Sequence, residues 1–524
     1  MRTSLAGRDR IKVLFLRPPR HFWPIINESD NFLLPLGYPC LAAYLREHTP
    51  GVELEILDCC SQRVGWRSLA EELRIRRPDV VCIGELTIYY KEGFRGFELI
   101  KEVLPGAVTV AGGYIYSAMP EWTLRECPAV DFVIRQEGEE TLRELVEVLR
   151  GGGNPGQVAG VVTPGRAHPC LVMARPLPDP LDSLPIPAYD LCDLDKYSPF
   201  GMLWPKAVTI QRARGCHFSC NFCSWWVQEG QEVEEDGALS VKSCYRSKSP
   251  ERVVEETELL YEKHGVRYLF WVDGTWNVDT AWLDAYCEEI IRRQYKLGWW
   301  SFIRADLLLE QERSGVLEKM VAAGLRHVLI GIERQKDEDF ETIGKVGYSE
   351  DAVRECCHLL ASKYPQVFRQ GTILTGMRQD DADSIRSLLH YAHDCNLDFP
   401  AFHPVMPFPG TPLWTEAKAK GWIEEWDFEN YDMFYPVMAT EHLTREEVSH
   451  HTSWCYQNFV ARKPWRYFTR LFSRHKIRRR LHWWFLIAIG RTIAMDLWRS
   501  LKGEKGFEGF AAVNKMWKPR WYER

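Results

Sequence analysis

The stretch Cys216-His-Phe-Ser-Cys220-Asn-Phe-Cys223 decides how the rest of this chain is interpreted. It places three cysteines at C-x3-C-x2-C spacing, directly after the apolar, strand-like run 207–210 and Gly215. Three thiolates can hold three irons of a cubane iron–sulfur cluster, whereas a cluster that only carries electrons usually has four. The spacing therefore predicts a [4Fe-4S] cluster whose fourth iron is open to a small molecule.

Two other uses of these cysteines are weaker. Zinc would need a fourth ligand, and the neighbouring candidates are Cys244 and His217, which is too close in sequence to share one tetrahedron comfortably. A disulfide framework does not suit 16 scattered cysteines. It also does not suit the polar, charged opening 1–10, which we expect to be neither a secretory signal nor a membrane anchor. Irregularly spaced thiols favour a reducing compartment, and we expect a cytoplasmic protein.

The cysteine stretch resembles the signature of the radical S-adenosylmethionine (radical SAM) superfamily, in which the residue before the last cysteine is usually aromatic, as Phe222 is here. The resemblance implies that S-adenosylmethionine chelates the open iron through its amino and carboxylate groups. It also implies reductive cleavage to a 5′-deoxyadenosyl radical, which abstracts hydrogen from an unactivated carbon. The electron would come from a donor such as flavodoxin or ferredoxin.

At 524 residues the chain is too long for one ordinary domain. A hydrophobic content of 45% and a net charge of −6 describe a soluble globular protein with an ample core. Changes in composition divide it into four regions: an N-terminal domain 1–150, a proline-rich linker 151–205, a second repeating domain 206–430, and a helical, basic, tryptophan-rich region 431–524.

Residues 1–150 alternate strand-like and helix-like stretches, which predicts an α/β domain with a doubly wound parallel sheet. The strand-like runs are 11–16, 52–57, 79–84, 107–113 and 131–134. Ligands of such sheets lie at the carboxyl ends of the strands, and glycines fall at those ends. No G-x-G-x-x-G follows the first strand, so a dinucleotide is not expected.

Leu-Pro-Leu-Gly at 34–37, Ala-Gly-Gly at 111–113 and Glu-Gly-Glu at 137–139 resemble the cobalamin-binding domain of cobalamin-dependent radical SAM enzymes. This family includes the anaerobic magnesium-protoporphyrin ester cyclase, hopanoid methylases and antibiotic C-methyltransferases. The resemblance implies a set of cobalamin-binding residues: Gly84, Thr87, Gly112, Gly113, Tyr114, Gly138 and Glu139.

Two departures concern the lower face of the cobalt. The Asp-x-His-x-x-Gly loop that supplies a lower histidine in other cobalamin proteins is absent, because Cys59-Cys60-Ser61 follows Asp58. Tyr114 also stands where many relatives have a histidine. We therefore expect no histidine below the cobalt. The alternative is a domain that has kept the sheet and lost the cofactor.

Residues 206–430 resume the strand–helix rhythm and predict six parallel strands in a partial (β/α)6 barrel, with the chemistry at the carboxyl ends of the strands. By resemblance, Asp273 and Gly274 would hold the methionine amino group and Arg304 the methionine carboxylate. Glu333 would contact the ribose and Gly376 the adenosine, although Gly376-Met-Arg-Gln-Asp380 departs from the usual Gly-x-Pro-x-Glu. For any one charged residue, a structural salt bridge is the alternative.

The C-terminal region combines positive charge with aromatic residues. Residues 462–480 contain nine basic side chains and no acidic one, and the apolar run 481–490 is far shorter than the roughly 20 residues that span a bilayer. We expect a helix that covers the barrel mouth and lines the substrate pocket. Peripheral contact with anionic lipid is the alternative, and nucleic-acid binding is not expected because no recognition motif accompanies the charge.

The resemblances together imply a cobalamin-dependent radical SAM enzyme. The reaction we expect is methylation of an unactivated carbon in a small molecule, lipid or natural product, with a second S-adenosylmethionine renewing the methyl group. Two alternatives remain: an oxidative cyclase or rearrangement enzyme that uses the same cofactors, and a non-catalytic cobalamin or redox sensor. The sequence specifies neither the substrate nor further catalytic residues.

Overall fold

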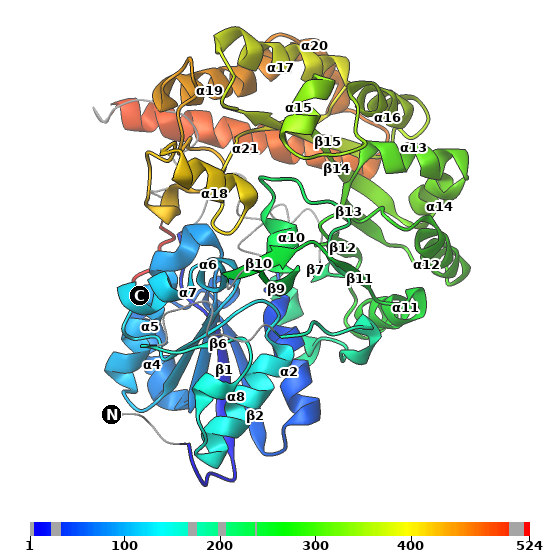
Figure 1. The fold of residues 1–524 in the computed structure, drawn as a ribbon. Helices are drawn as coiled ribbons and strands as arrows, with labels where there is room; N and C mark the ends of the chain where they lie inside the picture. Colours follow the sequence, from blue (N-terminus) through cyan, green and yellow to red (C-terminus); the bar gives the residue numbers. More distant parts are fainter. Residues whose placement is uncertain (1–4, 22–32, 166–174, 198–205, 236–237, 502–517) are drawn as a thin grey trace.

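The computed structural model describes residues 5–21, 33–165, 175–197, 206–235, 238–501 and 518–524 (Figure 1). Two parallel sheets organise the described chain, one in the N-terminal third and one in the region that contains the cysteine stretch. Helices pack on the outside of both sheets, and a long C-terminal helix, α21, crosses the second one. The predicted fold class, α/β with a helical C-terminal region, is confirmed.

The first sheet has the strand order β2-β1-β3-β4-β5-β6. The strands are β1 (Ile11–Arg17), β2 (Val52–Asp58), β3 (Val80–Gly84), β4 (Val108–Gly112), β5 (Phe132–Ile134) and β6 (Val161–Val162), of which only β6 is antiparallel to its neighbour. The helices are α2 (Gly37–His48), α3 (Cys59–Gln62), α4 (Trp66–Arg76), α5 (Tyr90–Val103), α6 (Tyr114–Ala118), α7 (Pro120–Glu126) and α8 (Glu139–Gly151), with the short turn η1 (Thr87–Tyr89). All five predicted strands are present.

This strand order defines where a ligand of the first sheet would lie. The order reverses between β1 and β3, so the connections leave these two neighbouring strands in opposite directions. In open α/β sheets a ligand binds outside the carboxyl ends of the strands at such a switch point.

The described part of the linker contacts both domains. It contains the short turns η2 (Pro155–Gln157), η4 (Leu181–Ser183), η5 (Tyr189–Leu191) and η6 (Leu194–Lys196). The Tyr189 hydroxyl donates to Glu256 of the second domain at 2.6 Å, and the Tyr197 hydroxyl donates to Asp58 of the first domain at 2.9 Å. Both tyrosines are buried, so this part of the linker is an ordered strap.

The second sheet is the predicted partial barrel, with six parallel strands in the order β16-β15-β14-β13-β12-β7. The strands are β7 (Ala207–Ile210), β12 (Tyr268–Trp271), β13 (Gly298–Ile303), β14 (Leu325–Glu333), β15 (Phe368–Thr375) and β16 (Phe399–Pro404). The helices are α11 (Pro250–Glu258), continued by the π-turn η7 (Leu259–Lys263), α12 (Thr280–Arg292), α13 (Ala305–Arg313), α14 (Val316–Ala323), α15 (Asp337–Thr342), α16 (Glu350–Ser362), α17 (Ala382–Asp394) and α18 (Pro412–Ala419).

Short elements surround the cysteine stretch, which follows β7. Strand β8 (Ala213–Gly215) pairs with β11 (Tyr245–Ser247) in front of the first cysteine. Helix α10 (Ser224–Gln228) begins directly after the last cysteine, and the hairpin of β9 (Gln231–Glu235) and β10 (Ala238–Lys242) follows it. The cysteines are therefore held between a strand pair and a helix.

The C-terminal region starts with the turn η8 (Phe428–Asn430) and continues in α19 (Arg445–Ala461), α20 (Pro464–Arg470) and α21 (Lys476–Leu501). Helical structure begins at Arg445, later than the predicted change near residue 431, and the basic stretch is divided between α20 and the start of α21. Helix α21 packs against aromatic residues of the barrel sheet: Phe485 stacks on Phe399 and Phe368 with ring centroids 4.0 and 5.5 Å apart. Phe368 and Phe399 begin their strands, so α21 covers the barrel sheet near the amino ends of β15 and β16. That the C-terminal region also covers the barrel mouth and lines the substrate pocket stays a prediction.

The end of the chain returns to the first domain (Figure 1). The backbone N–H groups of Trp66 and Ser68 donate to the carbonyl oxygens of Tyr522 and Arg524 at 3.0 and 2.9 Å. Gly65 is required here, because a Cβ atom at this position would lie 1.9 Å from the carbonyl oxygen of Trp521. The last residues therefore bind the start of α4.

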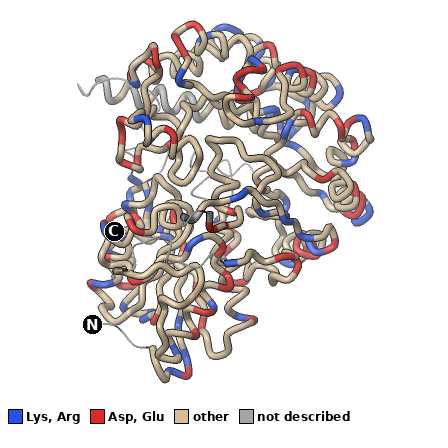
Figure 2. The backbone as a smooth tube through the Cα atoms, viewed as in Figure 1, with Lys and Arg blue, Asp and Glu red and all other residues tan. Residues whose placement is uncertain are grey.

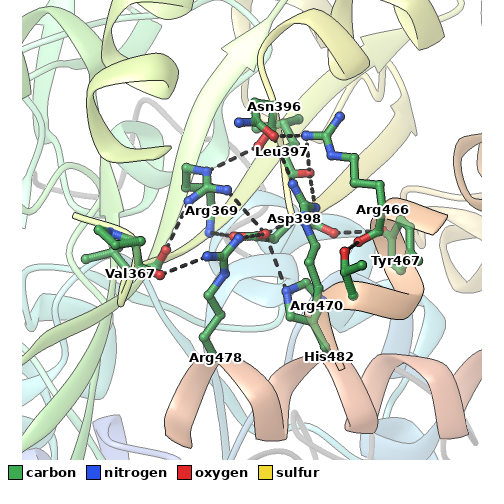
Figure 3. A network of polar contacts seen from close by, with 12 residues as sticks. Val367, Arg369, Asn396, Leu397, Asp398, Arg466, Tyr467, Arg470, Arg478 and His482 are labelled. Carbon is green, nitrogen blue, oxygen red and sulfur yellow. Dashed lines mark hydrogen bonds and ion pairs between the residues drawn. The ribbon is translucent and has the colours of Figure 1, made fainter. Parts of the chain in front are cut away.

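A buried carboxylate fastens the basic stretch to the barrel (Figure 3). Asp398, immediately before β16, is fully buried and accepts from Arg478 at 2.7 Å and from Arg470 at 3.1 Å. Arg369 of β15 and His482 of α21 lie 3.3 and 3.4 Å from the same oxygen. Burial acts to raise the pKa of Asp398, but the three arginines and the hydrogen bond from His482 hold it well below its usual range. Part of the basic stretch is thus structural.

Candidate functional site

The cysteine loop is held by backbone contacts on every side. The N–H of Cys216 donates to the carbonyl oxygen of Cys244 at 2.9 Å, and the N–H of Cys223 donates to that of Cys220 at 3.1 Å. The indole N–H of Trp226 also donates to the Cys220 carbonyl, at 2.9 Å. Gly215, with a φ of 79°, allows the chain to enter the loop, since a Cβ atom there would lie 1.8 Å from the Cys244 oxygen.

The three thiol groups lie close enough to influence one another. Burial raises the pKa of Cys223 to about 12, and the neighbouring Cys220 and Cys216 add to the rise. Burial also raises the pKa of Cys220, while the positive charges of Lys345 and Arg304 lower it. Three converging thiols beside cations suit a metal centre, because bound iron stabilises thiolates that would otherwise repel one another. These residues fit a cluster held by three cysteines.

The two nearby candidates for a zinc ligand are engaged elsewhere. The Cys244 thiol lies 3.5 Å from the carbonyl oxygen of Glu229, and the His217 ring stacks on Tyr245 at a centroid distance of 4.2 Å. The arrangement therefore favours a three-cysteine site over tetrahedral zinc.

Asp273 and Gly274 follow β12 and lie beside the cysteine loop, as predicted. One carboxylate oxygen of Asp273 accepts from the backbone N–H groups of Ala213 and Arg212 at 2.6 and 3.1 Å, which braces the strand before the loop. The other oxygen, Oδ2, is buried and has no hydrogen-bond partner among the described residues. Burial raises the pKa of Asp273 to about 6. A cationic group such as an ammonium would satisfy the unpaired oxygen.

Gly274 leaves space between the loop and β12. A Cβ atom there would lie 3.5 Å from the carbonyl oxygen of Gly215 and 3.9 Å from the Cβ of Cys216. The next residue, Thr275, has its hydroxyl 3.6 Å from the Cys216 sulfur. The backbone after β12 therefore borders the first cysteine directly.

Arg304, at the end of β13, is buried beside the loop. Its guanidinium group lies over the Phe218 ring, 3.7 Å from the centroid, so it faces the segment between the first two cysteines. Asp306 accepts from its Nε and Nη2 atoms at 3.1 and 2.8 Å. The predicted position is correct, and the structural salt bridge considered as an alternative is also present.

Glu333 ends β14 in a buried ion pair that the sequence did not indicate. Its Oε1 atom lies 3.0 Å from Nζ of Lys345, and its Oε2 atom accepts from the Thr372 hydroxyl at 3.2 Å. Glu333 has a φ of 61°, in the left-handed region, beside a register shift that turns the strand end. A strained backbone of this kind costs free energy and recurs at active sites and ligand-binding positions.

Gly376 and Phe222 occupy their predicted elements. Gly376 follows β15 with a φ of 71°, and a Cβ atom there would lie 2.9 Å from Cγ1 of Val448 in α19. The close approach of α19 is therefore enough to require glycine at this position, without any contact to adenosine. Phe222 is half-buried and packs against the main hydrophobic core, which anchors the loop between the second and third cysteines.

The carboxyl edge of the first sheet carries the predicted cobalamin residues. Gly84 and Gly112 pair with each other at the ends of β3 and β4. A Cβ atom at Gly112 would meet nothing within 4 Å, so open space lies above this strand end. At Gly113, with a φ of 77°, a Cβ atom would lie 2.6 Å from the backbone nitrogen of Glu85. The open space above Gly112 lies at the carboxyl edge of the sheet, where a ligand of this domain would bind.

Two further predicted residues stand beside this edge. Thr87 is buried in η1, which follows β3. Tyr114 is buried at the start of α6, and its hydroxyl donates to the carbonyl oxygen of Pro409, after β16, at 2.5 Å. Burial raises the pKa of Tyr114, and the nearby Cys223 thiol raises it further. The end of β4 therefore lies near both the barrel and the cysteine loop.

Gly138 and Glu139, after β5, lie at the boundary between the two domains. Glu139 pairs with Arg214 at 2.6 Å, and its neighbour Glu137 pairs with Arg214 at 2.7 Å and with Arg246. Gly138 is explained by packing, because a Cβ atom would lie 3.1 Å from Leu41. In this structure Glu139 binds the strand that leads into the cysteine loop, so its charge joins the two domains.

Two charged residues near the cysteine loop could not be predicted from the sequence, because neither stands at the end of a strand. Lys345 lies in a loop after α15, where no strand-end rule points to it, although Gly344 and Gly347 on either side both have positive φ. Glu229 braces the entrance of the cysteine loop by accepting from the Gly215 N–H at 2.7 Å. Burial raises the pKa of Glu229 to about 7.

Comparisons with known families agree with both halves of the fold. The B12 binding domain matches residues 23–146, and the radical SAM superfamily matches residues 210–392. The protein is therefore a radical SAM enzyme that carries a B12-binding domain. The two matches lie in the order that the sequence predicts, with the B12-binding domain before the radical SAM domain.

Three known proteins illustrate the relationship. An uncharacterized methyltransferase of Pyrococcus horikoshii is 28% identical, over 86% of this chain and 93% of its own length. The anaerobic magnesium-protoporphyrin IX monomethyl ester cyclase of Rubrivivax gelatinosus is 26% identical, over 90% of this chain and 80% of its own. The structure of OxsB, a cobalamin-dependent S-adenosylmethionine radical enzyme, superposes with a TM-score of 0.66 at 16% identity, over 96% of this chain and 77% of its own. The likeness to OxsB supports the fold.

Proposed function

We propose that this enzyme transfers a methyl group to an unactivated carbon of a small molecule, lipid or natural product. One observation carries the proposal: the carboxyl edge of the first sheet is joined to the cysteine loop of the barrel. Tyr114 bonds to Pro409, and Gln136 donates from its side-chain amide to the Val227 carbonyl oxygen at 3.2 Å. Arg214, two residues before Cys216, pairs with Glu137 and Glu139. A cobalamin and a cluster held at these two edges would be neighbours.

When bound, the cluster, S-adenosylmethionine and cobalamin would supply a 5′-deoxyadenosyl radical and a transferable methyl group. The chain's own part is to bind and orient these groups and to exclude water. The three cysteines would hold the cluster, and the backbone at Gly274 with the unpaired Oδ2 of Asp273 would face the methionine amino group. Arg304 would bind the methionine carboxylate through Nη1, since Asp306 occupies its Nε and Nη2 atoms.

Glu333 is proposed to contact the ribose, with Lys345 fixing its carboxylate. The two side chains are nearly fully buried and lie 3.0 Å apart, so the carboxylate is held in one position. The Glu333→Gln variant should keep its iron content but bind S-adenosylmethionine about tenfold more weakly, since one hydrogen bond to a charged group is lost. Glu312→Gln, on the surface of α13, is the matched control. If both variants bind S-adenosylmethionine with the same affinity, Glu333 does not contact it.

Methyl transfer can be tested without the substrate. Methyl transfer requires a second S-adenosylmethionine that renews the methyl group, so the reduced holoenzyme should form S-adenosylhomocysteine as well as 5′-deoxyadenosine. With candidate substrates, mass spectrometry should detect the gain of one methyl group. Formation of 5′-deoxyadenosine alone, with no S-adenosylhomocysteine under any reducing condition, would contradict the proposal.

A second candidate function is oxidative cyclisation. The relative from Rubrivivax gelatinosus is a cyclase, and its similarity spans 90% of this chain. A cyclase would release a product that has lost hydrogens, whereas a methyltransferase product has gained a methyl group. The same mass measurement therefore separates the two reactions.

The enzyme would also need a one-electron donor, and we propose a flavodoxin or ferredoxin. Reductive cleavage of S-adenosylmethionine consumes an electron at each event, and the described residues provide only the one candidate cluster site. Turnover should therefore depend on an added protein reductant or a strong chemical one.

A further inference from the structure

Helix α21 has an exposed apolar face that the barrel does not use. Trp483, Leu486, Ile487, Leu497, Trp498 and Leu501 are all more than 40% exposed. With Gly490 and Ala494 they recur at the three- and four-residue spacing that places side chains on one side of a helix. The face runs for about 27 Å along the axis. Its C-terminal half extends past the edge of the barrel (Figure 1).

Exposed aromatic residues of α20 and the following turn continue this face. Trp465, Phe468 and Phe472 are 76%, 51% and 65% exposed. Their rings form a row, with centroids 5.5 Å apart for Trp465 and Phe468 and 5.2 Å apart for Phe468 and Phe472. The indole N–H of Trp483 donates to the carbonyl oxygen of Leu471 at 3.1 Å, which joins the row to α21. We name these nine side chains the apolar ridge: Trp465, Phe468, Phe472, Trp483, Leu486, Ile487, Leu497, Trp498 and Leu501.

The ridge is flanked by positive charge. Three of the nine basic residues in 462–480 turn inward: Arg470 and Arg478 bind Asp398, and Arg466 binds Asn396 (Figure 3). The others stay at or near the surface, and Arg462, Lys463, Arg474 and Lys476 form no ion pair with any described residue. Elsewhere in the described chain, residues of both signs are interspersed (Figure 2).

The first turns of α21 are fixed on the side opposite the ridge. Leu481, Trp484 and Phe485 are buried against the barrel sheet. His482, between them, lies 3.4 Å from the buried Asp398. Exposed apolar side chains on a well-anchored helix indicate an interaction site more strongly than exposed side chains on a mobile tail.

From this arrangement we propose that α20 and α21 lie on the surface of a bilayer that contains anionic lipid. The ridge would enter the region between headgroups and acyl chains, and the arginines and lysines beside it would bind the headgroup phosphates. Tryptophan is favoured at that depth because its ring is apolar and its N–H remains near water. None of the described helices is long and apolar enough to cross a membrane, so α21 would lie in the plane of the surface.

A second copy of the chain is the competing occupant. A two-fold interface would place the ridge of one molecule against the ridge of another, since such interfaces bury the same patch on both sides. It would also bring the unpaired cations of both copies together, where like charges repel. An anionic lipid surface offers the opposite charge, and the charge pattern therefore favours the membrane.

The test uses the full-length holoenzyme and sedimentation with vesicles. Wild-type protein should bind vesicles of phosphatidylcholine with phosphatidylglycerol, bind pure phosphatidylcholine weakly, and dissociate as salt is raised. The Trp465→Ala/Phe468→Ala/Phe472→Ala variant should bind at least about tenfold more weakly, because buried apolar area is lost. Lys463→Glu/Arg474→Glu should weaken binding only to the anionic vesicles.

Controls make each outcome decisive. Trp426→Ala changes an exposed tryptophan outside the ridge and should bind like wild type. Iron content and melting temperature should match wild type in every variant that is compared. Binding that is equal in wild type and ridge variants, or wild-type protein that never binds anionic vesicles, overturns the proposal. Self-association that the ridge substitutions abolish, without vesicle binding, assigns the ridge to a second copy instead.

Discussion

The hydroxyl group of Tyr114 donates a 2.5 Å hydrogen bond to the backbone carbonyl of Pro409 and so joins the end of β4 to the barrel. The tyrosine ring also meets Phe408 edge to face, with centroids 6.3 Å apart. Tyr114 follows the paired glycines of the B12-binding domain, and Pro409 follows the last barrel strand. The contact therefore connects the two edges at which the cofactors are proposed to bind.

This contact leads to a prediction about the cobalt. Because the Tyr114 hydroxyl is engaged by Pro409, and no histidine follows the paired glycines, bound cobalamin should have no nitrogen ligand from the protein on its lower face. With cobinamide, which has no benzimidazole nitrogen of its own, the electron paramagnetic resonance spectrum of the cobalt(II) form should lack nitrogen superhyperfine splitting, and Tyr114→Phe should leave that spectrum unchanged. A nitrogen splitting in the wild type would contradict the prediction, and His21→Gln would then test the histidine that follows β1.

Cluster binding should depend on three cysteines and not on a fourth. Replacing Cys216, Cys220 and Cys223 together by alanine should remove the iron and the visible absorbance, because these thiols are the only ones that the loop brings together. Cys244→Ser is the matched control, since that thiol contacts the Glu229 carbonyl instead. Iron analysis after anaerobic reconstitution is the measurement. Unchanged iron in the triple variant, or iron lost in Cys244→Ser, would refute the assignment.

The two glycines after β4 should respond differently to substitution. Gly112→Val should fold normally and bind cobalamin about tenfold more weakly or worse, because the new side chain enters open space where the cofactor would lie. Gly113→Val should lower the melting temperature instead, because Gly113 has a positive φ and its Cβ atom would meet the Glu85 backbone. Cobalamin retained after desalting and thermal unfolding measure the two effects. Wild-type affinity in Gly112→Val would place the cofactor elsewhere.

Asp398→Asn should be strongly destabilising. The substitution leaves Arg369, Arg470 and Arg478 buried or half-buried around a neutral group, and breaking a buried ion pair from one side costs about 3–5 kcal/mol. Asp190→Asn is the control, because the Arg46–Asp190 pair is exposed and such pairs contribute about 1 kcal/mol at most. Chemical or thermal unfolding compares the variants. A similar small loss in both would show that the Asp398 network does not hold the C-terminal region in place.

His327 should make the barrel sensitive to mild acid. Burial lowers the pKa of this histidine to about 3 in the folded protein. In the unfolded chain the imidazole takes up a proton as soon as the pH falls below its ordinary pKa. Unfolding is therefore favoured as the pH falls from about 6.5 towards 3, and the loss reaches about 2 kcal/mol at pH 5. His327→Gln cannot be protonated and should lose less stability than wild type between pH 7.5 and pH 5. Melting temperatures at the two pH values test this, and equal losses would contradict it.

The sequence by itself determined the architecture and the main chemical centre. Apolar runs of four to eight residues, separated by helix-length stretches, specify buried parallel strands, so the five parallel strands of the first sheet and all six of the barrel could be predicted. The short antiparallel strand β6 was not predicted. The C-x3-C-x2-C loop was equally readable, because ligands to one cluster must be close in space and here they are also close in sequence. The strand-end positions of Asp273, Arg304 and Glu333 followed from barrel geometry.

Only the tertiary structure decided what those side chains contact. Asp273 braces the loop with one oxygen, Arg304 is paired with Asp306, and Glu333 is held by Lys345 from a loop that no periodicity marks. The basic stretch was ambiguous for the same reason. Charge along the sequence does not tell that the buried Asp398 binds Arg470 and Arg478, which follow it by 72 and 80 residues. Local patterns specify backbone periodicity and exposure, whereas ion pairs and covered faces depend on which distant segments the fold brings together.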